Sequence, residues 1–153
     1  MRSRKLVCCC FVLLFASAAL GQKDERYVVV PLNAAQKIPF RLFDASVQLG
    51  TWQPSQLDID ALEANLPQLS ALSPSGWKPV RHIEHPEQYY RQYIGVTVHS
   101  NNLIYVNAFC DNPPPPTWKT QLYIVIDGGT CYWQAFYDPA AKKFSNLMID
   151  GRA

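Results

Sequence analysis

The chain has 153 residues, which allows one compact domain and leaves little room for a second. Its 48% hydrophobic, 12% aromatic and 17% charged residues exclude an intrinsically disordered chain, which would carry few aromatic residues and a large net charge. Without the three basic residues among the first five positions, 11 basic side chains (14 − 3) face 12 acidic ones, a net charge of −1. No nucleic-acid partner is expected, because counterion release requires a dense basic patch.

Residues 1–21 have the three parts of a secretory signal peptide: a basic start, an apolar run and small residues at the end. The apolar run, Leu6–Leu20, has 15 residues, whereas a membrane-spanning helix needs about 20. Cleavage after Gly21 or after Ala18 would satisfy the small-residue requirement, and we favour Gly21. The sequence therefore predicts an exported protein, periplasmic or secreted, with one domain over 22–153 and no stable membrane span after cleavage.

Three of the five cysteines, Cys8–Cys10, lie inside the leader and are lost with it. The remaining pair, Cys110 and Cys131, predicts a disulfide in an oxidising compartment. Closing the 20-residue loop between them stabilises the fold by about 3 kcal/mol on the chain-entropy model. A redox or nucleophilic thiol would need a Cys-x-x-Cys spacing or an oriented histidine, and neither is visible.

The N-terminal half of the mature chain contains weak strand signals. Tyr27–Val30 is a short β-branched run stopped by Pro31, which indicates an edge strand. Ile38, Phe40 and Leu42 alternate as residues of a strand would.

The clearest helix begins after Ser55, which lies three residues before Asp58 and forms a plausible capping pair with it. Apolar residues follow at spacings of three and four, at Ile59, Leu62, Leu66 and Leu69. Pro67 predicts that the regular helix ends near Leu66 or is kinked there. A proline-rich, irregular connection over 73–86 is expected next.

Strand periodicity dominates the C-terminal half. Tyr89–His99 and Leu103–Cys110 predict a hairpin with its turn at Ser100–Asn102. A second hairpin is expected from Gln121–Ile126 and Thr130–Tyr137.

The turn of that second hairpin, Asp127–Gly129, is the strongest local signal in the sequence. A last strand is expected over Phe144–Ile149. Together these elements predict an α+β fold, in which a curled antiparallel sheet of four to five strands packs on one main N-terminal helix. The order resembles cystatin-like or NTF2-like rolls, an analogy of fold only.

Aromatic residues are the feature most in excess, with four tryptophans and eight tyrosines. They fill the core of a small domain or form a recognition face. Trp77 and Trp118 stand in predicted loops beside Gly, Pro and Lys, and are our candidates for exposed anchors.

A run of four prolines completes the candidate binding residues: Pro113, Pro114, Pro115 and Pro116. Such a run favours a stiff polyproline II segment that docks into an aromatic groove of a partner. The competing interpretation, which we prefer, is a rigid spacer that shapes the connection.

No constellation of residues identifies a catalytic or metal site. His82 and His85, with Glu84 between them, could bind zinc from a helix with His99 or Asp127 as a further ligand. Pro86 disfavours helical geometry at His85, so we expect loop histidines and no metal.

The acidic residues at strand ends, Asp111, Asp127 and Asp138, are expected as turn residues rather than as acid and base. No Gly-x-Ser-x-Gly motif and no glycine-rich phosphate loop is present. The sequence therefore assigns no catalytic residue and no cofactor.

Several C-terminal segments carry a resemblance: Tyr105–Cys110 (YVNAFC), Asp127–Tyr132 (DGGTCY), Tyr137–Pro139 and Phe144–Gly151. They look like the C-terminal half of small exported bacterial proteins of unassigned function, over roughly Tyr89–Ala153. The resemblance supports the two-cysteine framework and implies a compartment and a fold only.

Two hypotheses of function follow. The first is an exported binding or inhibitor-like module whose partner is an envelope or extracellular protein. The alternative is a small hydrolase or lyase with an acid–base site in the concavity of the sheet, lined by His99, Asp127 or Asp111. The missing catalytic constellation favours the first hypothesis.

Overall fold

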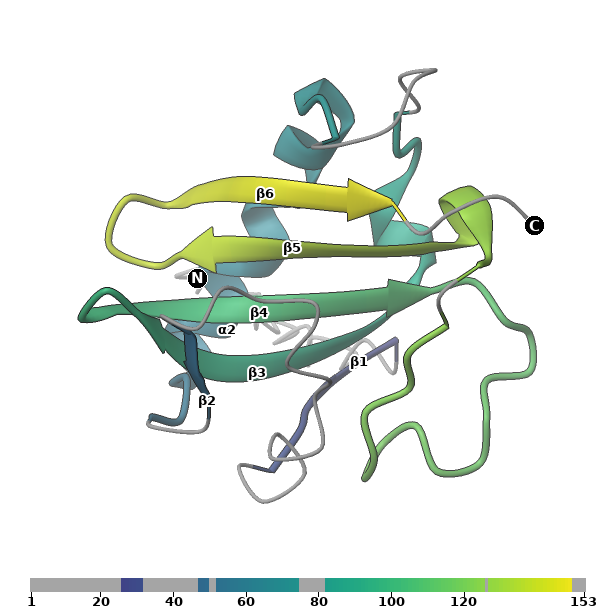
Figure 1. Ribbon diagram of the computed structural model, residues 1–153, viewed down its shortest axis with the longest axis horizontal. Helices are drawn as coiled ribbons and strands as arrows, with labels where there is room; N and C mark the ends of the chain where they lie inside the picture. Colours follow the sequence, from purple (N-terminus) through teal and green to yellow (C-terminus); the bar gives the residue numbers. More distant parts are fainter. Residues whose placement is uncertain (1–25, 32–46, 50–51, 75–81, 126, 150–153) are drawn as a thin grey trace, which may run out of the picture.

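The computed structural model describes residues 26–31, 47–49, 52–74, 82–125 and 127–149. Within them, a single sheet carries one α-helix on one of its faces (Figure 1), which confirms the α+β fold class. The predictions made for the leader, for the alternation over 38–42 and for Trp77 lie outside the described residues.

Six strands form the sheet: β1 Tyr27–Val29, β2 Val47–Leu49, β3 Tyr90–Val98, β4 Asn101–Phe109, β5 Tyr132–Asp138 and β6 Lys143–Ile149. The strand order is β1-β3-β4-β5-β6, and β2 pairs with β3 off this path. The pairs from β3 to β6 are antiparallel, as predicted. Because β1 runs parallel to β3, the whole sheet is mixed rather than purely antiparallel.

The predicted helix is confirmed as α2, Gln56–Asn65. Its N-terminus is held by a capping box, in which the Asp58 carboxylate accepts the Ser55 backbone N–H at 2.9 Å and the Ser55 hydroxyl accepts the Asp58 N–H at 3.3 Å. Pro67 ends the α-helical hydrogen bonding, and the chain continues as the 3₁₀ helix η2, Leu66–Ala71. The predicted apolar residues are all buried: Ile59, Leu62, Leu66 and Leu69.

Both faces of the central strands are buried, whereas the sequence indicated one covered face. On the helix side, α2 and η2 pack on Tyr93, Val106 and Trp133, among others. A second cluster on the opposite side consists of Val30, Ile94, Val96, Tyr105 and Phe136. With apolar cover on both faces, the period-two pattern does not separate buried from exposed positions in β3.

Gln68 protects the outer edge of β6. Its amide Nε2 donates to the Lys142 carbonyl at 3.1 Å, and its Oε1 accepts the Phe144 N–H at 3.3 Å. Lys142 lies in the β5–β6 turn with φ 53°, and Phe144 is the second residue of β6. The Gln68 side chain therefore bonds the start of this edge, where a neighbouring strand would otherwise take the Phe144 N–H.

The hairpin between β3 and β4 is confirmed, but its turn is earlier than predicted. Val98 pairs with Asn101, which leaves a two-residue turn of His99 (φ 45°) and Ser100 (φ 68°). Two successive positive φ angles characterise the hairpin turn that matches the twist of the strands. The predicted turn was displaced toward Asn101 and Asn102 because asparagine and glycine are the common residues with positive φ. The two turn positions are instead occupied by His99 and Ser100.

We expect the double substitution His99→Asn, Ser100→Gly to stabilise the protein by about 1 kcal/mol, because both new residues tolerate positive φ better. Urea unfolding checks this, with the Thr97→Ser variant as a control in the adjacent strand. An unchanged or lower urea midpoint in the double variant would contradict the turn geometry.

Candidate functional site

The predicted disulfide is confirmed between Cys110 and Cys131, with 5.1 Å between their Cα atoms. Phe109 and Tyr132 form the last pair of the β4–β5 ladder, so the disulfide lies one step beyond it. The bond fixes both ends of the connection over 111–130, which extends beyond the sheet in Figure 1.

The strand predicted over Gln121–Ile126 is wrong. Residues 122–125 belong to no strand, and Gly129–Cys131 form the short 3₁₀ helix η4 before β5. The disulfide and the ladder place β5 directly beside β4, so the intervening segment has no sheet edge to join. We name residues 118–125 the strap, because they cross the face of the sheet opposite α2.

Two buried amide side chains hold the strap. Gln92 on β3 donates from Nε2 to the carbonyls of Trp118 and Gln121, the latter at 2.7 Å, and accepts the Tyr123 N–H on Oε1 at 2.8 Å. Asn107, its register partner on β4, donates to the Tyr123 carbonyl at 2.6 Å and to Gln92 Oε1 at 2.9 Å. Each bond from these amides to the strap goes to its backbone rather than to its side chains.

Sequence reasoning missed this pair of amides. A signal was present, because Gln92 lies between Tyr90 and Ile94 on one face of the predicted strand. A polar residue within an apolar strand face must be hydrogen-bonded when it is buried, and Gln92 and Asn107 are no more than 1% exposed.

Trp118 is buried, with 5% of its surface exposed, so the expectation of an exposed anchor is wrong. Its ring contacts Tyr90 and Phe109 edge-to-face, at centroid distances of 5.3 and 5.9 Å. Tyr123 contacts Phe109 and Tyr132 in the same manner at 5.1 and 6.3 Å. The rings of the strap therefore cover the aromatic end of the sheet on the face opposite α2.

The proline run leads into the strap. Pro113 and Pro116 are exposed, and Pro114 and Pro115 are half-buried. The Pro115 carbonyl accepts the Trp118 N–H at 3.0 Å, which starts a turn over residues 116–120.

The tip of this turn is exposed. The Thr117 carbonyl accepts the N–H groups of Thr120 and Gln121, each at 2.9 Å. Lys119 and Thr120 are exposed, and the Lys119 ammonium lies 5.6 Å from the centre of the Trp118 ring. The loop thus combines a buried aromatic base with a polar tip.

Asp111 and Tyr132 close the base of the loop beside the disulfide. The Tyr132 hydroxyl donates to Asp111 Oδ1 at 2.9 Å. Burial, and secondarily this hydrogen bond, raise the pKa of Tyr132 well above its ordinary value. Gly128 packs against the Tyr132 ring so closely that no Cβ fits there.

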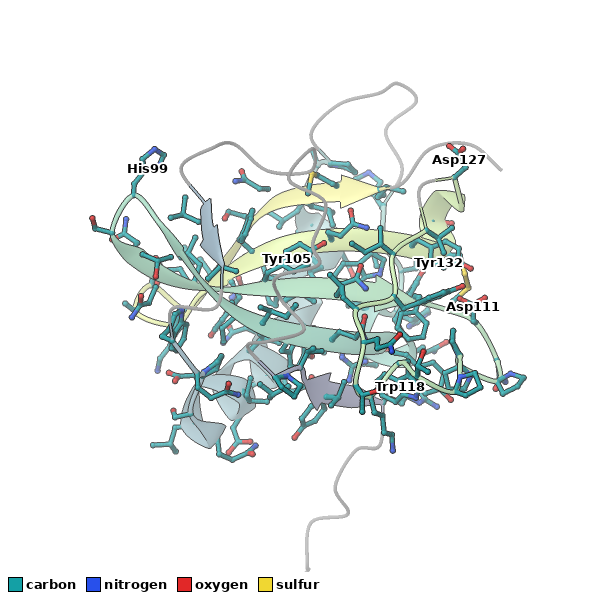
Figure 2. The ribbon with its side chains drawn as sticks, turned by 60° about the horizontal axis from the view of Figure 1, so that its bottom comes forward. His99, Tyr105, Asp111, Trp118, Asp127 and Tyr132 are labelled. Carbon is teal, nitrogen blue, oxygen red and sulfur yellow. A yellow bond between two sulfur atoms is a disulfide. The ribbon has the colours of Figure 1, made fainter. Side chains whose placement is uncertain are left out.

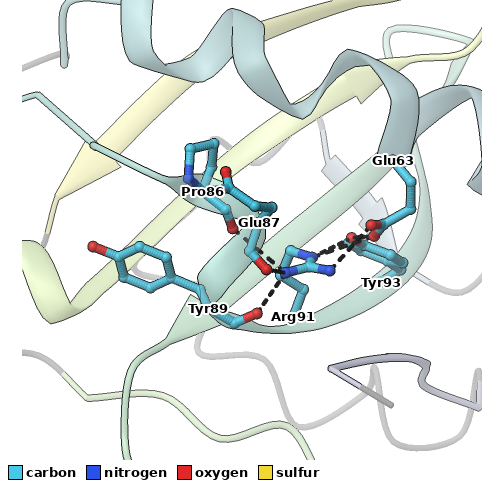
Figure 3. A network of polar contacts seen from close by, with 6 residues as sticks. All are labelled: Glu63, Pro86, Glu87, Tyr89, Arg91 and Tyr93. Carbon is cyan, nitrogen blue, oxygen red and sulfur yellow. Dashed lines mark hydrogen bonds and ion pairs between the residues drawn. The ribbon is translucent and has the colours of Figure 1, made fainter. Parts of the chain in front are cut away.

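A polar network on the helix side joins α2 to β3 (Figure 3). Arg91 is fully buried, and its Nε and Nη2 donate to the two Glu63 carboxylate oxygens at 3.2 and 3.0 Å. Tyr93 donates to Glu63 and accepts from Arg91 Nε at 2.9 Å. Nη1 donates to the carbonyls of Pro86, Glu87 and Tyr89.

Every nitrogen of this guanidinium already bonds to the protein. An arginine that binds an anionic substrate would need donors directed to a ligand. The Glu63–Arg91–Tyr93 network therefore anchors the helix and the segment before β3.

The candidate acid–base residues do not form one site. His99 lies in the β3–β4 turn, at the end of the sheet opposite to Asp111 and Asp127 (Figure 2). Asp138 accepts the N–H groups of Ala140 and Ala141 at 2.9 and 3.0 Å, as a turn residue does.

The histidine pair lies in a loop. Residues 82–85 have no regular secondary structure, and His82 and His85 are exposed on either side of buried Ile83. Among the described residues, no group of three or more His, Cys, Asp and Glu side chains is placed to hold a metal ion. The helices of the described segments include none with the length and hydropathy needed to span a bilayer.

No family model matches the chain, and no curated protein and no solved structure matches it.

We expect Arg91→Ala to destabilise the protein by about 3–5 kcal/mol, because it leaves the partly buried Glu63 carboxylate without its cationic partner and removes a donor from three backbone carbonyls. Leu57→Ala is the control, since Leu57 is 80% exposed on α2 and its loss changes stability by less than about 0.5 kcal/mol. Urea unfolding measures both. A loss below about 1 kcal/mol for Arg91→Ala would contradict a structural role for the network.

Alkaline pH should destabilise the fold through Tyr93. Burial, opposed by Arg91, raises the pKa of its phenol well above the ordinary value of 10.0. The unfolded chain therefore loses this proton near pH 10 while the folded chain keeps it, so stability is full below pH 10 and falls above it. Tyr93→Phe should reduce the slope of unfolding free energy against pH above 10 by up to about 1.4 kcal/mol per pH unit. An unchanged slope in alkaline urea titrations would contradict the assignment.

Proposed function

We propose that the protein is an exported, inhibitor-like binding module of the cell envelope or extracellular space, and that the loop over 111–125 is its contact surface for a partner protein. One observation carries the proposal. A long connection without a strand is held in place by three different kinds of contact, namely the disulfide, the Gln92 and Asn107 amides, and the aromatic rings.

Such restraint favours binding because association must otherwise overcome the entropy of ordering a loop. Connections of more than about 12–15 residues without secondary structure are usually functional or disordered, and the contacts to this loop argue against disorder. Its exposed residues are polar and proline-rich at the tip, at Asn112, Pro113, Pro116, Thr117, Lys119, Thr120 and Gln121.

Export is supported by the signal-like residues 1–21 and by a disulfide, which persists in oxidising compartments. The resemblance of the C-terminal half to small exported bacterial proteins agrees with this location. One helix on a curled sheet is also compatible with a cystatin-like or NTF2-like roll, which stays our hypothesis for the closer fold relationship.

The hydrolase or lyase alternative has less support. His99 is separated by the length of the sheet from Asp111. Asp111 in turn accepts a hydrogen bond from Tyr132 at the base of the loop. No described observation gives this alternative an acid and a base in one place.

We test the proposal by photocrosslinking in the native host, with a photoreactive phenylalanine analogue in place of Lys119. The matched control carries it in place of Leu57, which is also exposed and lies on α2 at the other face of the sheet. We expect a discrete crosslinked partner from position 119 and none from position 57.

Gln92→Met provides a second arm, because it keeps the side-chain length and removes the bonds to the strap. We expect it to reduce the crosslink at position 119 by about threefold or more through loss of loop order. Equal products from positions 119 and 57, or no product from 119, would contradict the proposed contact surface.

A further inference from the structure

The strap is extended at its centre and turns one backbone edge toward the sheet. The Gln121 carbonyl and both backbone groups of Tyr123 point to the Gln92 and Asn107 amides. In an extended backbone, the N–H and C=O of one residue lie on one side and those of its neighbours on the other. The backbone groups of Leu122 and Ile124 therefore point away from the sheet.

This outer edge has no hydrogen-bond partner among the described residues. Within the part of the chain that the structure describes, Leu122 and Ile124 make no backbone hydrogen bond, and both residues are only half-buried. The Leu122 carbonyl and the Ile124 N–H are two residues apart, as are the Lys142 carbonyl in the β5–β6 turn and the Phe144 N–H of β6, which the Gln68 amide binds. Among the described residues, the pair at the start of β6 is thus hydrogen-bonded and the pair on the strap is not.

We propose that the outer edge of the strap binds an extended peptide segment of a partner protein by strand addition. The partial charges of the Leu122 carbonyl and the Ile124 N–H complement the N–H and C=O of one extended residue, which pairs with both. Leu122 packs against the cluster on the sheet face opposite α2, and the half-buried aliphatic side chains of Ile124 and Val125 favour apolar or β-branched residues in the peptide.

The occupant is a peptide rather than a charged ligand, because these two backbone groups are neutral and have no ionic partner. Little ordering is needed on the side of the strap, since the sheet amides already hold it extended. The inference rests on the proposed function and names the kind of partner segment that the loop binds.

The test pans a random heptapeptide display library on the immobilised, oxidised protein. We expect enrichment of sequences with alternating apolar or β-branched residues, and at least about tenfold weaker binding of the enriched peptides to Ile124→Pro. Proline removes the outer N–H and keeps the preceding residue extended, the conformation that Tyr123 already has. Ile124→Ala, which keeps the N–H, should weaken binding by less than about threefold.

Amide hydrogen exchange controls for the fold of the variant and provides an independent readout. Ile124→Pro must retain slow exchange at the Tyr123 N–H, which bonds inward to Gln92. In the unsubstituted protein, the enriched peptide should slow hydrogen exchange at the Ile124 N–H. If the strap of Ile124→Pro no longer holds its position on the sheet, this measurement alone tests whether the peptide bonds the outer edge.

The inference is overturned if no peptide is enriched, if Ile124→Pro binds as well as Ile124→Ala, or if the peptide leaves exchange at Ile124 unchanged. A crosslinked partner at position 119 together with any of these results would leave the proposed function in place and remove strand addition as its mode. If that crosslink is absent while the peptide still binds at the strap, strand addition is supported and the proposed function is contradicted.

Discussion

A side-chain amide bonded to the backbone of an extended segment is the interaction on which this fold depends. Gln92 binds a carbonyl and the N–H two residues later on the strap, and Gln68 binds the Lys142 carbonyl of the β5–β6 turn and the Phe144 N–H at the start of β6. Backbone polar groups near an apolar core must be hydrogen-bonded, and a strand partner normally does this. Here glutamine side chains replace the strand at two places.

This substitution explains how so small an α+β domain covers both faces of its sheet. The helix side is closed by α2 and η2, which pack directly on the strands. On the other side no second helix is described, and the strap brings Trp118 and Tyr123 over the aromatic end of the sheet. Burying these two rings also brings their backbone polar groups close to the sheet. The Gln92 amide makes this possible, because it hydrogen-bonds the Trp118 carbonyl and the Tyr123 N–H.

Elements specified by neighbouring residues could be predicted from the sequence. The capping box at Ser55 and the apolar spacing of α2 are local, and both are confirmed. The disulfide followed from the number of cysteines outside the predicted leader. The β3–β4 hairpin followed from periodicity, although its turn uses residues that seldom adopt positive φ.

Features that depend on distant partners could not be predicted in this way. Arg91 belongs to the polar set of its strand by alternation, and only the placement of Glu63 on α2 makes it a core residue. Gln121–Ile126 has the composition of a strand, but β5 occupies the neighbouring position on β4. Trp118 is buried for the same reason, because a segment excluded from the sheet edge packs over the sheet face instead.

The hydrogen bonds of Gln68 also bear on the association of this protein with copies of itself. Open strand edges allow identical chains to stack into fibrils, and the outermost strand of a sheet is where such growth starts. Gln68 belongs to the same chain as the edge it covers, so a competing strand from another copy must displace a group whose effective concentration is on the order of millimolar. A single neutral side chain thus resists fibril growth without adding a charge to the surface.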